Sequence, residues 1–293
     1  MKALSRIGVA AAMAVAASAG HAADWSDTYI GYRTGSKFAE PFGSNDIHKD
    51  IINFAHVSGY KYGTNFFNAD LLMSDDKDPS AFGSSNGAHE VYIVYRNTVD
   101  LEKAAGVAAK FGPVRGMGVT FGFDVNAKTD AGYNSKKRML VLGPTLFVDV
   151  PGFLNVSLLL LKESNQPSGT TFATDPPSSY SVSRYSYKTH PMLTAAWGIP
   201  IGDSGFSFEG FMNWIASKGD NEFVGSPNRG TKPETNIDAQ IMYDVGALMG
   251  AKGKFKVGLE YQYWKNKFGN DHEGAAGDGA FAKTPMLRAE YHF

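Results

Sequence analysis

The sequence predicts an all-β fold, a transmembrane antiparallel β-barrel of about 12 strands. Apolar and charged residues alternate through 287–293 (Leu-Arg-Ala-Glu-Tyr-His-Phe), so one face of this segment is apolar and the other is charged. A lipid-embedded barrel with a wet lumen requires that pattern. The chain also contains 20 Phe, 14 Tyr and 33 Gly, a composition suited to strands, interface aromatics and tight turns.

The N-terminal segment resembles a secretory signal peptide. Lys2 and Arg6 provide a basic start, an apolar run follows, and Gly20 and Ala22 are small residues at the −3 and −1 positions of a cleavage site. The apolar run is shorter than the ~20 residues that a membrane-spanning helix needs. We therefore expect residues 1–22 to be a cleaved signal peptide and 23–293 a single barrel domain in the bacterial outer membrane.

Composition excludes several classes of function. The formal net charge is −1, which argues against nucleic acid as a partner, since such proteins carry a clear basic excess. The chain has no Cys, which excludes disulfides, thiol catalysis and Cys-ligated zinc. The histidines form no H-E-x-x-H pair, and the acidic loop segments lack EF-hand spacing. We expect no metal and no cofactor.

Period-two stretches bounded by turn residues give the candidate strands. They are Thr28–Phe38, Asp50–Tyr60, Gly63–Met73, His89–Thr98, Gly116–Ala127, Lys137–Val150, Phe153–Glu163, Tyr187–Ile199, Phe206–Ser217, Glu234–Val245, Phe255–Phe268 and Thr284–Phe293.

The joints between these strands mostly alternate between short and long. Short joints lie at 60–63, 151–152 and 200–203, and long polar joints lie between them. Short periplasmic turns and longer extracellular loops are typical of outer-membrane barrels. The exceptions are a rather long inner joint, 99–115, and a short outer joint, 129–136.

The alternation assigns each side chain to a face. In the segment 255–268, Val257, Leu259, Tyr261 and Tyr263 oppose Lys256, Glu260, Gln262 and Trp264. An exported soluble β-sandwich would alternate in the same way, so this fold stays open as an alternative. The segment 116–127 places Gly118 and Gly122 on the inward face, and the segment 255–268 places Gly258 there. We interpret these glycines as favouring open space in the lumen.

Several short motifs resemble the Tsx-type nucleoside-specific channel family of Gram-negative outer membranes. They are Pro41-Phe42-Gly43, Phe66-Phe67-Asn68-Ala69-Asp70, Phe111-Gly112-Pro113, Tyr261-Gln262-Tyr263-Trp264 and Glu290-Tyr291-His292-Phe293. The resemblance covers nearly all of the chain after residue 22. It implies a monomeric barrel of about 12 strands with a narrow lumen that passes nucleosides by passive diffusion. The residues on either side of Phe42-Gly43 differ from those of the characterised nucleoside channels.

A nucleoside channel needs aromatic rings to stack the base and polar groups to bind the ribose, each weakly enough for the solute to leave. The inward faces supply both kinds of side chain, and Phe42 is added because it matches a family position in the nucleoside pathway. The candidate substrate-binding residues are Phe42, Phe66, Asn68, Asp70, Glu90, Tyr92, Arg96, Asp238, Glu260, Trp264, Arg288 and Glu290. The simpler interpretation is that these charges form a salt-bridge network that fills a polar interior.

Other functions stay open beside the nucleoside channel. A general porin or a channel for another small solute would share the pattern. Some outer-membrane barrels are lipid hydrolases with an outward Ser/His pair, for which His56 and Ser58 are the nearest candidates. A structural or adhesin-like barrel with a closed lumen is a further alternative. We expect no catalytic residues and partners limited to outer-membrane lipid and small solutes, with recognition by phage or colicins left open.

Overall fold

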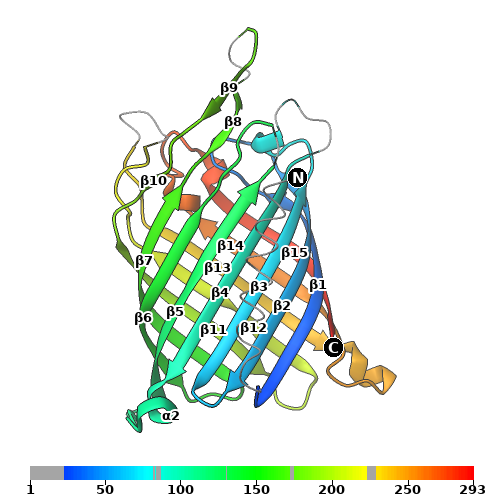
Figure 1. The fold of residues 1–293 in the computed structure, drawn as a ribbon. Helices are drawn as coiled ribbons and strands as arrows, with labels where there is room; N and C mark the ends of the chain where they lie inside the picture. Colours follow the sequence, from blue (N-terminus) through cyan, green and yellow to red (C-terminus); the bar gives the residue numbers. More distant parts are fainter. Residues whose placement is uncertain (1–22, 82, 84–86, 130, 172–174, 223–228) are drawn as a thin grey trace.

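The computed structural model describes residues 23–81, 83, 87–129, 131–171, 175–222 and 229–293, so the predicted signal segment lies outside it. The described residues form one closed antiparallel barrel of 12 long strands, as the sequence predicts (Figure 1). These strands are β1 (Trp25–Phe38), β2 (Ile47–Tyr60), β3 (Gly63–Ser74), β4 (His89–Asp100), β5 (Val114–Lys128), β6 (Arg138–Val148), β7 (Phe153–Asn165), β11 (His190–Pro200), β12 (Phe206–Ile215), β13 (Glu234–Asp244), β14 (Phe255–Lys265) and β15 (Phe281–His292).

The sheet closes because the last strand returns to the first. Each long strand pairs with the next along the chain, and β15 then pairs with β1, where Tyr291 lies opposite Ile30 and Arg288 lies opposite Arg33. Among the described long strands none is left as an open edge. The soluble-sandwich alternative is therefore wrong.

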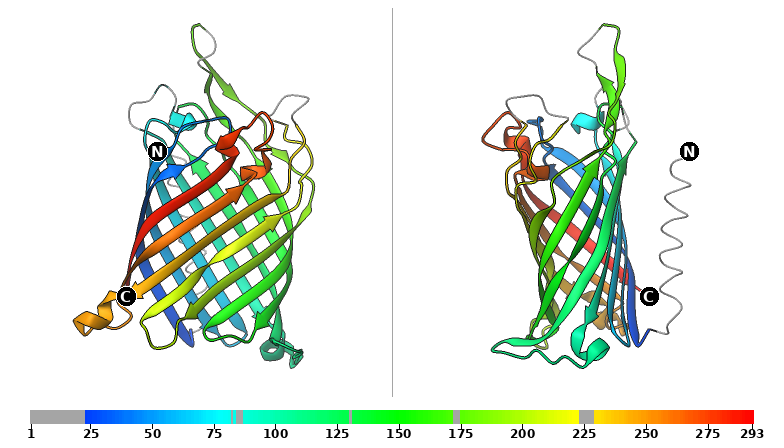
Figure 2. Two further views of the ribbon diagram at one scale, coloured as in Figure 1. Left: turned by 180° about the vertical axis from the view of Figure 1, so that it is seen from behind. Right: turned by 60° about the vertical axis from the view of Figure 1, so that its left-hand side comes forward.

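The two ends of the barrel differ in the length of their joints (Figures 1 and 2). At the end where Phe293 lies, here called the inner end, the joints 61–62, 149–152 and 201–205 are short. Two longer inner joints hold α2 (Leu101–Ala105) and η2 (Val245–Met249). The opposite, outer end carries long joints with β8 (Ser168–Thr171), β9 (Ser178–Ser181), β10 (Tyr185–Ser186), η1 (Pro79–Ala81), η3 (Lys267–Gly269) and η4 (Asp278–Ala280). The predicted alternation is confirmed.

The long inner joint after β4 has a local reason to fold as a helical turn. The carboxylate of Asp100 accepts hydrogen bonds from the backbone N–H groups of Glu102 and Lys103, at 2.9 and 3.2 Å, which is an N-cap. Gly106 then ends α2 in the left-handed region, at φ 70°.

Some predicted strand boundaries were wrong by a few residues. β1 begins at Trp25 and β2 at Ile47, because Trp25 still pairs with Gly59 and Phe38 with Ile47 beyond the clear alternation. β11 begins at His190, later than predicted, because the chain leaves the barrel ladder just before it: the Lys188 N–H donates to the Lys218 carbonyl of another outer joint, at 3.1 Å.

The assignment of faces is confirmed. Antiparallel partners point to the same side of a sheet, so the register carries one orientation from strand to strand. Leu259 and Leu287 are partners on the outward face and are 66% and 62% exposed, whereas Glu260, on the inward face, is 2% exposed. The outside of the barrel is thus a broad apolar belt, far larger than a soluble monomer exposes. Within the described ranges, no helix is long and apolar enough to span a membrane.

The interior is more filled than the sequence suggested. Inward residues of β6, β7 and β11 form a buried apolar cluster: Val141, Leu159, Leu161 and Met192. Gly118 does point inward, but the idea that it opens space is wrong, because the ring of Phe147 lies 2.8 Å from where its Cβ would stand. Part of the barrel interior is therefore packed like a protein core.

Candidate functional site

One group of predicted site residues meets in the inward faces of β1, β3, β14 and β15. Glu260 receives Arg33 at 3.0 Å and Arg288 at 2.7 Å, one arginine on each carboxylate oxygen. Arg33 also pairs with Asp70 at 2.7 Å, and Arg288 pairs with Glu290 at 2.6 Å. The two arginines lie opposite each other in the sheet, and the buried carboxylate of Glu260 compensates their like charge.

Sequence reasoning missed Arg33, the residue that connects this group across β1. Its position would have revealed it, because Arg33 follows Tyr29 and Gly31 at period-two spacing on the inward face. The predicted Asp238 lies close by, where it accepts a hydrogen bond from the Gln262 amide at 3.3 Å.

A second group lies on β3, β4 and β5. The Tyr92 hydroxyl donates to Asp124 at 3.1 Å, and Arg96 forms an ion pair with the same carboxylate. On the neighbouring strand β2, the Asn53 amide donates to Asn68 at 2.6 Å and to Asp70 at 2.8 Å, so Asn68 is connected to the first group through Asn53.

Two phenylalanine rings stand free on opposite walls of the interior. Phe66 is the inward partner of Arg96 and is 39% exposed, while Phe211 is the inward partner of Asp238 and is 37% exposed. Strands β3 and β12 lie six places apart in the ring of 12, so the two rings belong to opposing walls. Phe211 was missed because Gly210 interrupts the alternation of its strand in the sequence.

The outer end of the barrel is crossed by buried charge. Glu40 follows β1, and one oxygen of its carboxylate, Oε1, forms ion pairs with three lysines. The Nζ atoms lie at 2.7 Å for Lys49, 3.1 Å for Lys267 and 3.7 Å for Lys128. Lys128 ends β5 and Lys267 follows β14, which lie on opposite walls. A carboxylate reached from both walls stands over the lumen, so we call Glu40 and these three lysines the mouth cluster.

Burial and charge act in opposite directions in the mouth cluster. Burial alone would raise the pKa of Glu40, but the surrounding lysines hold that pKa well below its usual range. For Lys267 burial prevails over the attraction of Glu40 and lowers the pKa to about 8. Asp78 adds a second carboxylate, 3.4 Å from Lys49 and 3.9 Å from Lys128.

The predicted residues Glu90 and Trp264 lie at this outer level and not with the lumen groups below it. Glu90 pairs with Lys128 at 3.5 Å. The Trp264 indole N–H donates to Glu234 at 2.6 Å, and the Lys267 ammonium lies 4.8 Å from the centre of the Trp264 ring system. Trp264 is therefore already engaged by the charge layer at the mouth.

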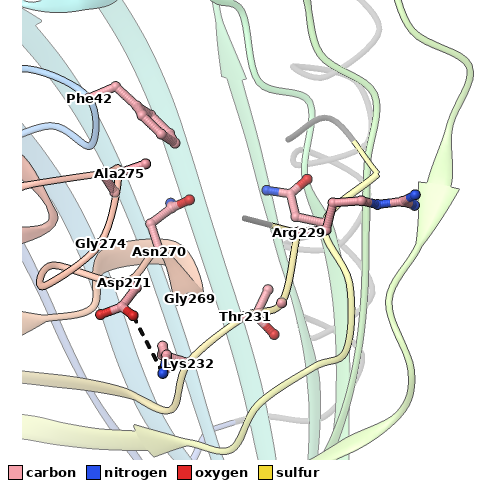
Figure 3. Close-up of a pocket in the computed structure, with 12 residues that line it drawn as sticks. Phe42, Arg229, Thr231, Lys232, Gly269, Asn270, Asp271, Gly274 and Ala275 are labelled. Atoms are coloured by element: carbon pink, nitrogen blue, oxygen red, sulfur yellow. Dashed lines mark ion pairs between the residues drawn. The ribbon is translucent and has the colours of Figure 1, made fainter. Parts of the chain in front are cut away.

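Phe42 lies above this layer, in a cavity of 270 Å³ at the outer surface (Figure 3). Its backbone N–H donates to the Ala276 carbonyl at 3.0 Å, and its ring is 58% exposed. The opposite rim holds an ion pair of Lys232 and Asp271 at 3.4 Å, with Asn270 and Thr231 beside it. An open ring facing polar groups can hold a flat solute that carries hydroxyls.

The structure thus distributes the 12 predicted residues over three levels. Phe42 lines the outer cavity, Glu90 and Trp264 contact lysines of the mouth cluster, and the other nine line the interior.

The geometry suits non-covalent recognition. The hydrolase candidate His56 points outward, and its Nδ1 shares a hydrogen bond with the Thr28 hydroxyl at 2.7 Å. In the part of the chain that the structure describes, no group of three or more His, Asp or Glu side chains is placed to hold a metal ion.

No protein-family model and no curated protein matches the chain, so the resemblance to Tsx-type channels rests on the short motifs alone. Solved barrels align along most of their length. The KdgM porin in complex with oligogalacturonate is 10% identical, with 90% of this chain and 99% of that chain covered and a TM-score of 0.42. The translocator domain of the autotransporter NalP from Neisseria meningitidis is 12% identical, with 100% and 97% covered and a TM-score of 0.41. The outer membrane protein OpdK from Pseudomonas aeruginosa is 9% identical, with 94% and 100% covered and a TM-score of 0.30. Similarity at this level does not decide function.

Proposed function

We propose that this chain is an outer-membrane channel for passive diffusion of small polar solutes and that nucleosides are its solutes. The observation that carries the proposal is an interior in which Arg33, Arg96 and Arg288 are each paired with a carboxylate, while the rings of Phe66 and Phe211 stay exposed. The broad apolar belt on the outside of the barrel supports a location in a lipid bilayer.

Paired charges favour an uncharged solute. An anion-selective pore requires basic side chains that are free to attract the solute, but Arg33, Arg96 and Arg288 each contact a carboxylate. A nucleoside carries no charge, so it leaves these pairs intact. Its flat base can stack on an exposed ring, and its ribose hydroxyls can bond to Asn68 or Asp70.

The arrangement also predicts weak and sequential binding. Stacking of one base on one aromatic ring contributes about 1–3 kcal/mol, which holds a solute briefly and lets it leave. Phe42 at the outer cavity and the two interior rings would form successive sites along the path. The mouth cluster narrows the passage between them, which favours a selective, low-conductance channel over a general porin.

The test is uptake of radiolabelled adenosine and thymidine into liposomes that contain the refolded protein. We expect saturable uptake that falls several-fold in Phe66→Ala and Phe211→Ala. The matched control is Phe121→Ala, because Phe121 is similarly exposed, at 43%, but lies on the outward face. Equal uptake in all four proteins would remove the interior rings from the path.

A closed, structural barrel is the second candidate, because the apolar cluster in β6, β7 and β11 and the mouth cluster both fill space. Liposomes that take up neither nucleosides nor small sugars would favour it. Uptake of sugars and nucleosides at equal rates would instead indicate a general pore.

We further propose that the protein acts as a monomer. The long outer joints leave its use by phage or colicins as a separate question for binding assays.

A further inference from the structure

The inner joint between β13 and β14 is longer than a barrel turn requires. Two residues suffice to connect neighbouring antiparallel strands, yet residues 245–254 extend this joint and fold η2 into it. We propose that this joint is an in-plane anchor that binds anionic phospholipids of the inner leaflet. The inference assumes that the barrel lies in a membrane but is independent of the solute.

The tip of the joint is apolar and bare. Leu248 is 73% exposed and Met249 is 72% exposed, more than any other large hydrophobic side chain in the described part of the chain. Adjacent apolar residues with this exposure would be unfavourable in water. They therefore require a partner.

The direction of the joint indicates the partner. In Figures 1 and 2 it projects sideways from the barrel wall next to the C-terminus, and does not point below the barrel along its axis. At the same edge the apolar belt ends in Tyr291 and Phe293, which are 53% and 63% exposed. An apolar tip that continues this belt sideways meets the lipid that surrounds the barrel, whereas a periplasmic protein would approach from below.

The charge of the joint fits an anionic headgroup. Lys252 and Lys254 are exposed on the segment that returns to the barrel. The nearest acid of the joint, Asp244, is turned inward, where its carboxylate accepts the backbone N–H groups of Ala247 at 3.2 Å and Gly253 at 2.7 Å. The outer surface of the joint therefore combines apolar and basic side chains, the composition of interfacial anchors for anionic lipid.

The joint is held in a fixed shape. The Ala251 N–H donates to the Gly246 carbonyl at 2.8 Å, and the His292 N–H of the last strand donates to the Lys254 carbonyl at 2.9 Å. Gly246 admits no side chain, because a Cβ there would stand 2.3 Å from the Ala251 oxygen. A joint that is held in one conformation by backbone hydrogen bonds and exposes apolar side chains is typical of a binding element and not of a simple connecting loop.

The test uses the absence of cysteine from the chain, which allows one spin label to be attached at a chosen site. Leu248→Cys, Leu259→Cys and Lys103→Cys would each be labelled in the refolded barrel in phosphatidylglycerol/phosphatidylcholine bilayers. Leu259 lies in the outward apolar belt and serves as the lipid control, and Lys103, which is exposed on α2, serves as the aqueous control. We expect the label at 248 to be more accessible to oxygen than to a water-soluble nickel chelate. The ratio of the two accessibilities at 248 should lie between the ratios at 259 and at 103.

A second arm tests the headgroup. With a fluorophore at position 248, brominated phosphatidylglycerol should quench the fluorescence more strongly than brominated phosphatidylcholine. The relative binding of phosphatidylglycerol calculated from this quenching should be higher by about 5-fold for each lysine. Replacing Lys252 and Lys254 with Gln should remove the preference and leave the depth unchanged. A label at 248 as accessible to the nickel chelate as the label at 103 would overturn the anchor. Equal quenching by both lipids in the labelled protein that keeps Lys252 and Lys254 would overturn the selectivity for anionic lipid.

Discussion

Glu40 and Lys267 lie 227 residues apart in the chain and form a buried ion pair at the outer mouth of the barrel, with 3.1 Å between Oε1 and Nζ. Because Lys128 reaches the same oxygen from the opposite wall, this one carboxylate ties both sides of the mouth together. Removing either partner of a buried pair leaves an uncompensated charge, which is costly. The mouth cluster is therefore both a brace and a constriction.

Glu40→Gln should widen the mouth. Without the carboxylate the three lysines repel each other, so residues 39–46 should lift away and the single-channel conductance should rise. We expect the free energy of unfolding to fall at the same time, by about 3–5 kcal/mol, which is the usual cost of breaking a buried ion pair. Glu102→Gln is the control, since Glu102 is exposed on α2 and pairs with Lys110 at 3.3 Å. Unchanged conductance in Glu40→Gln would show that residue 40 does not limit the pore.

Conductance should also depend on pH near 8. The pKa of Lys267, about 8, lies below the value of about 10.4 for an unburied lysine. Between these values the unfolded chain binds more protons than the folded one, so this group makes the barrel more stable as pH rises. The neutral amine no longer pairs with Glu40, so conductance should increase from pH 7 to 9 while the barrel stays folded. Lys267→Arg should abolish the change, and an identical pH profile in that variant would contradict this account.

Glu260→Gln should disturb the interior. Arg33 and Arg288 would lose their shared carboxylate and face each other across adjacent strands, which we expect to destabilise the barrel by about 3–5 kcal/mol. The added positive charge should shift the reversal potential in a salt gradient toward anion selectivity. Asp50→Asn is the control, because Asp50 lies on the outward face, where Tyr32 donates to it at 2.6 Å. Loss of heat-resistant migration on gels measures stability, and equal melting of both variants would argue against a structural role for Glu260.

Phe42→Ala should weaken nucleoside block without unfolding the protein. The ring is largely exposed, so its removal costs little packing, but loss of one stacking surface should raise the blocking concentration by about 5- to 150-fold. The effect should be larger for nucleosides added on the outer side. Unchanged block would remove Phe42 from the path.

The fold could be predicted from the sequence because its determinants are local. Alternation assigned Leu259 outward and Glu260 inward, and joint length separated the two ends of the barrel. The contacts within the barrel could not be predicted in this way. Glu40 meets Lys128 and Lys267 only because the barrel brings three distant segments together, and neither the period of a strand nor the chemistry of a turn encodes that meeting.

Glycine shows a second limit of prediction from the sequence. The sequence places Gly118 on the inward face correctly, but whether that position is empty depends on Phe147, which belongs to the neighbouring strand. The residue type therefore indicates space only after the neighbours are known. Arg33 and Phe211 were missed for other reasons, although their strands were found: the period-two spacing after Tyr29 and Gly31 already places Arg33 inward, and Gly210 interrupts the alternation before Phe211.

The most direct test of the nucleoside channel is single-channel recording of the refolded protein in a planar bilayer, with adenosine or thymidine added in steps. The account predicts small, steady currents that sub-millimolar to millimolar nucleoside reduces and that glucose at the same concentration leaves unchanged. Currents indifferent to nucleosides would contradict the assignment and leave a general pore, and the absence of any current would favour a closed barrel.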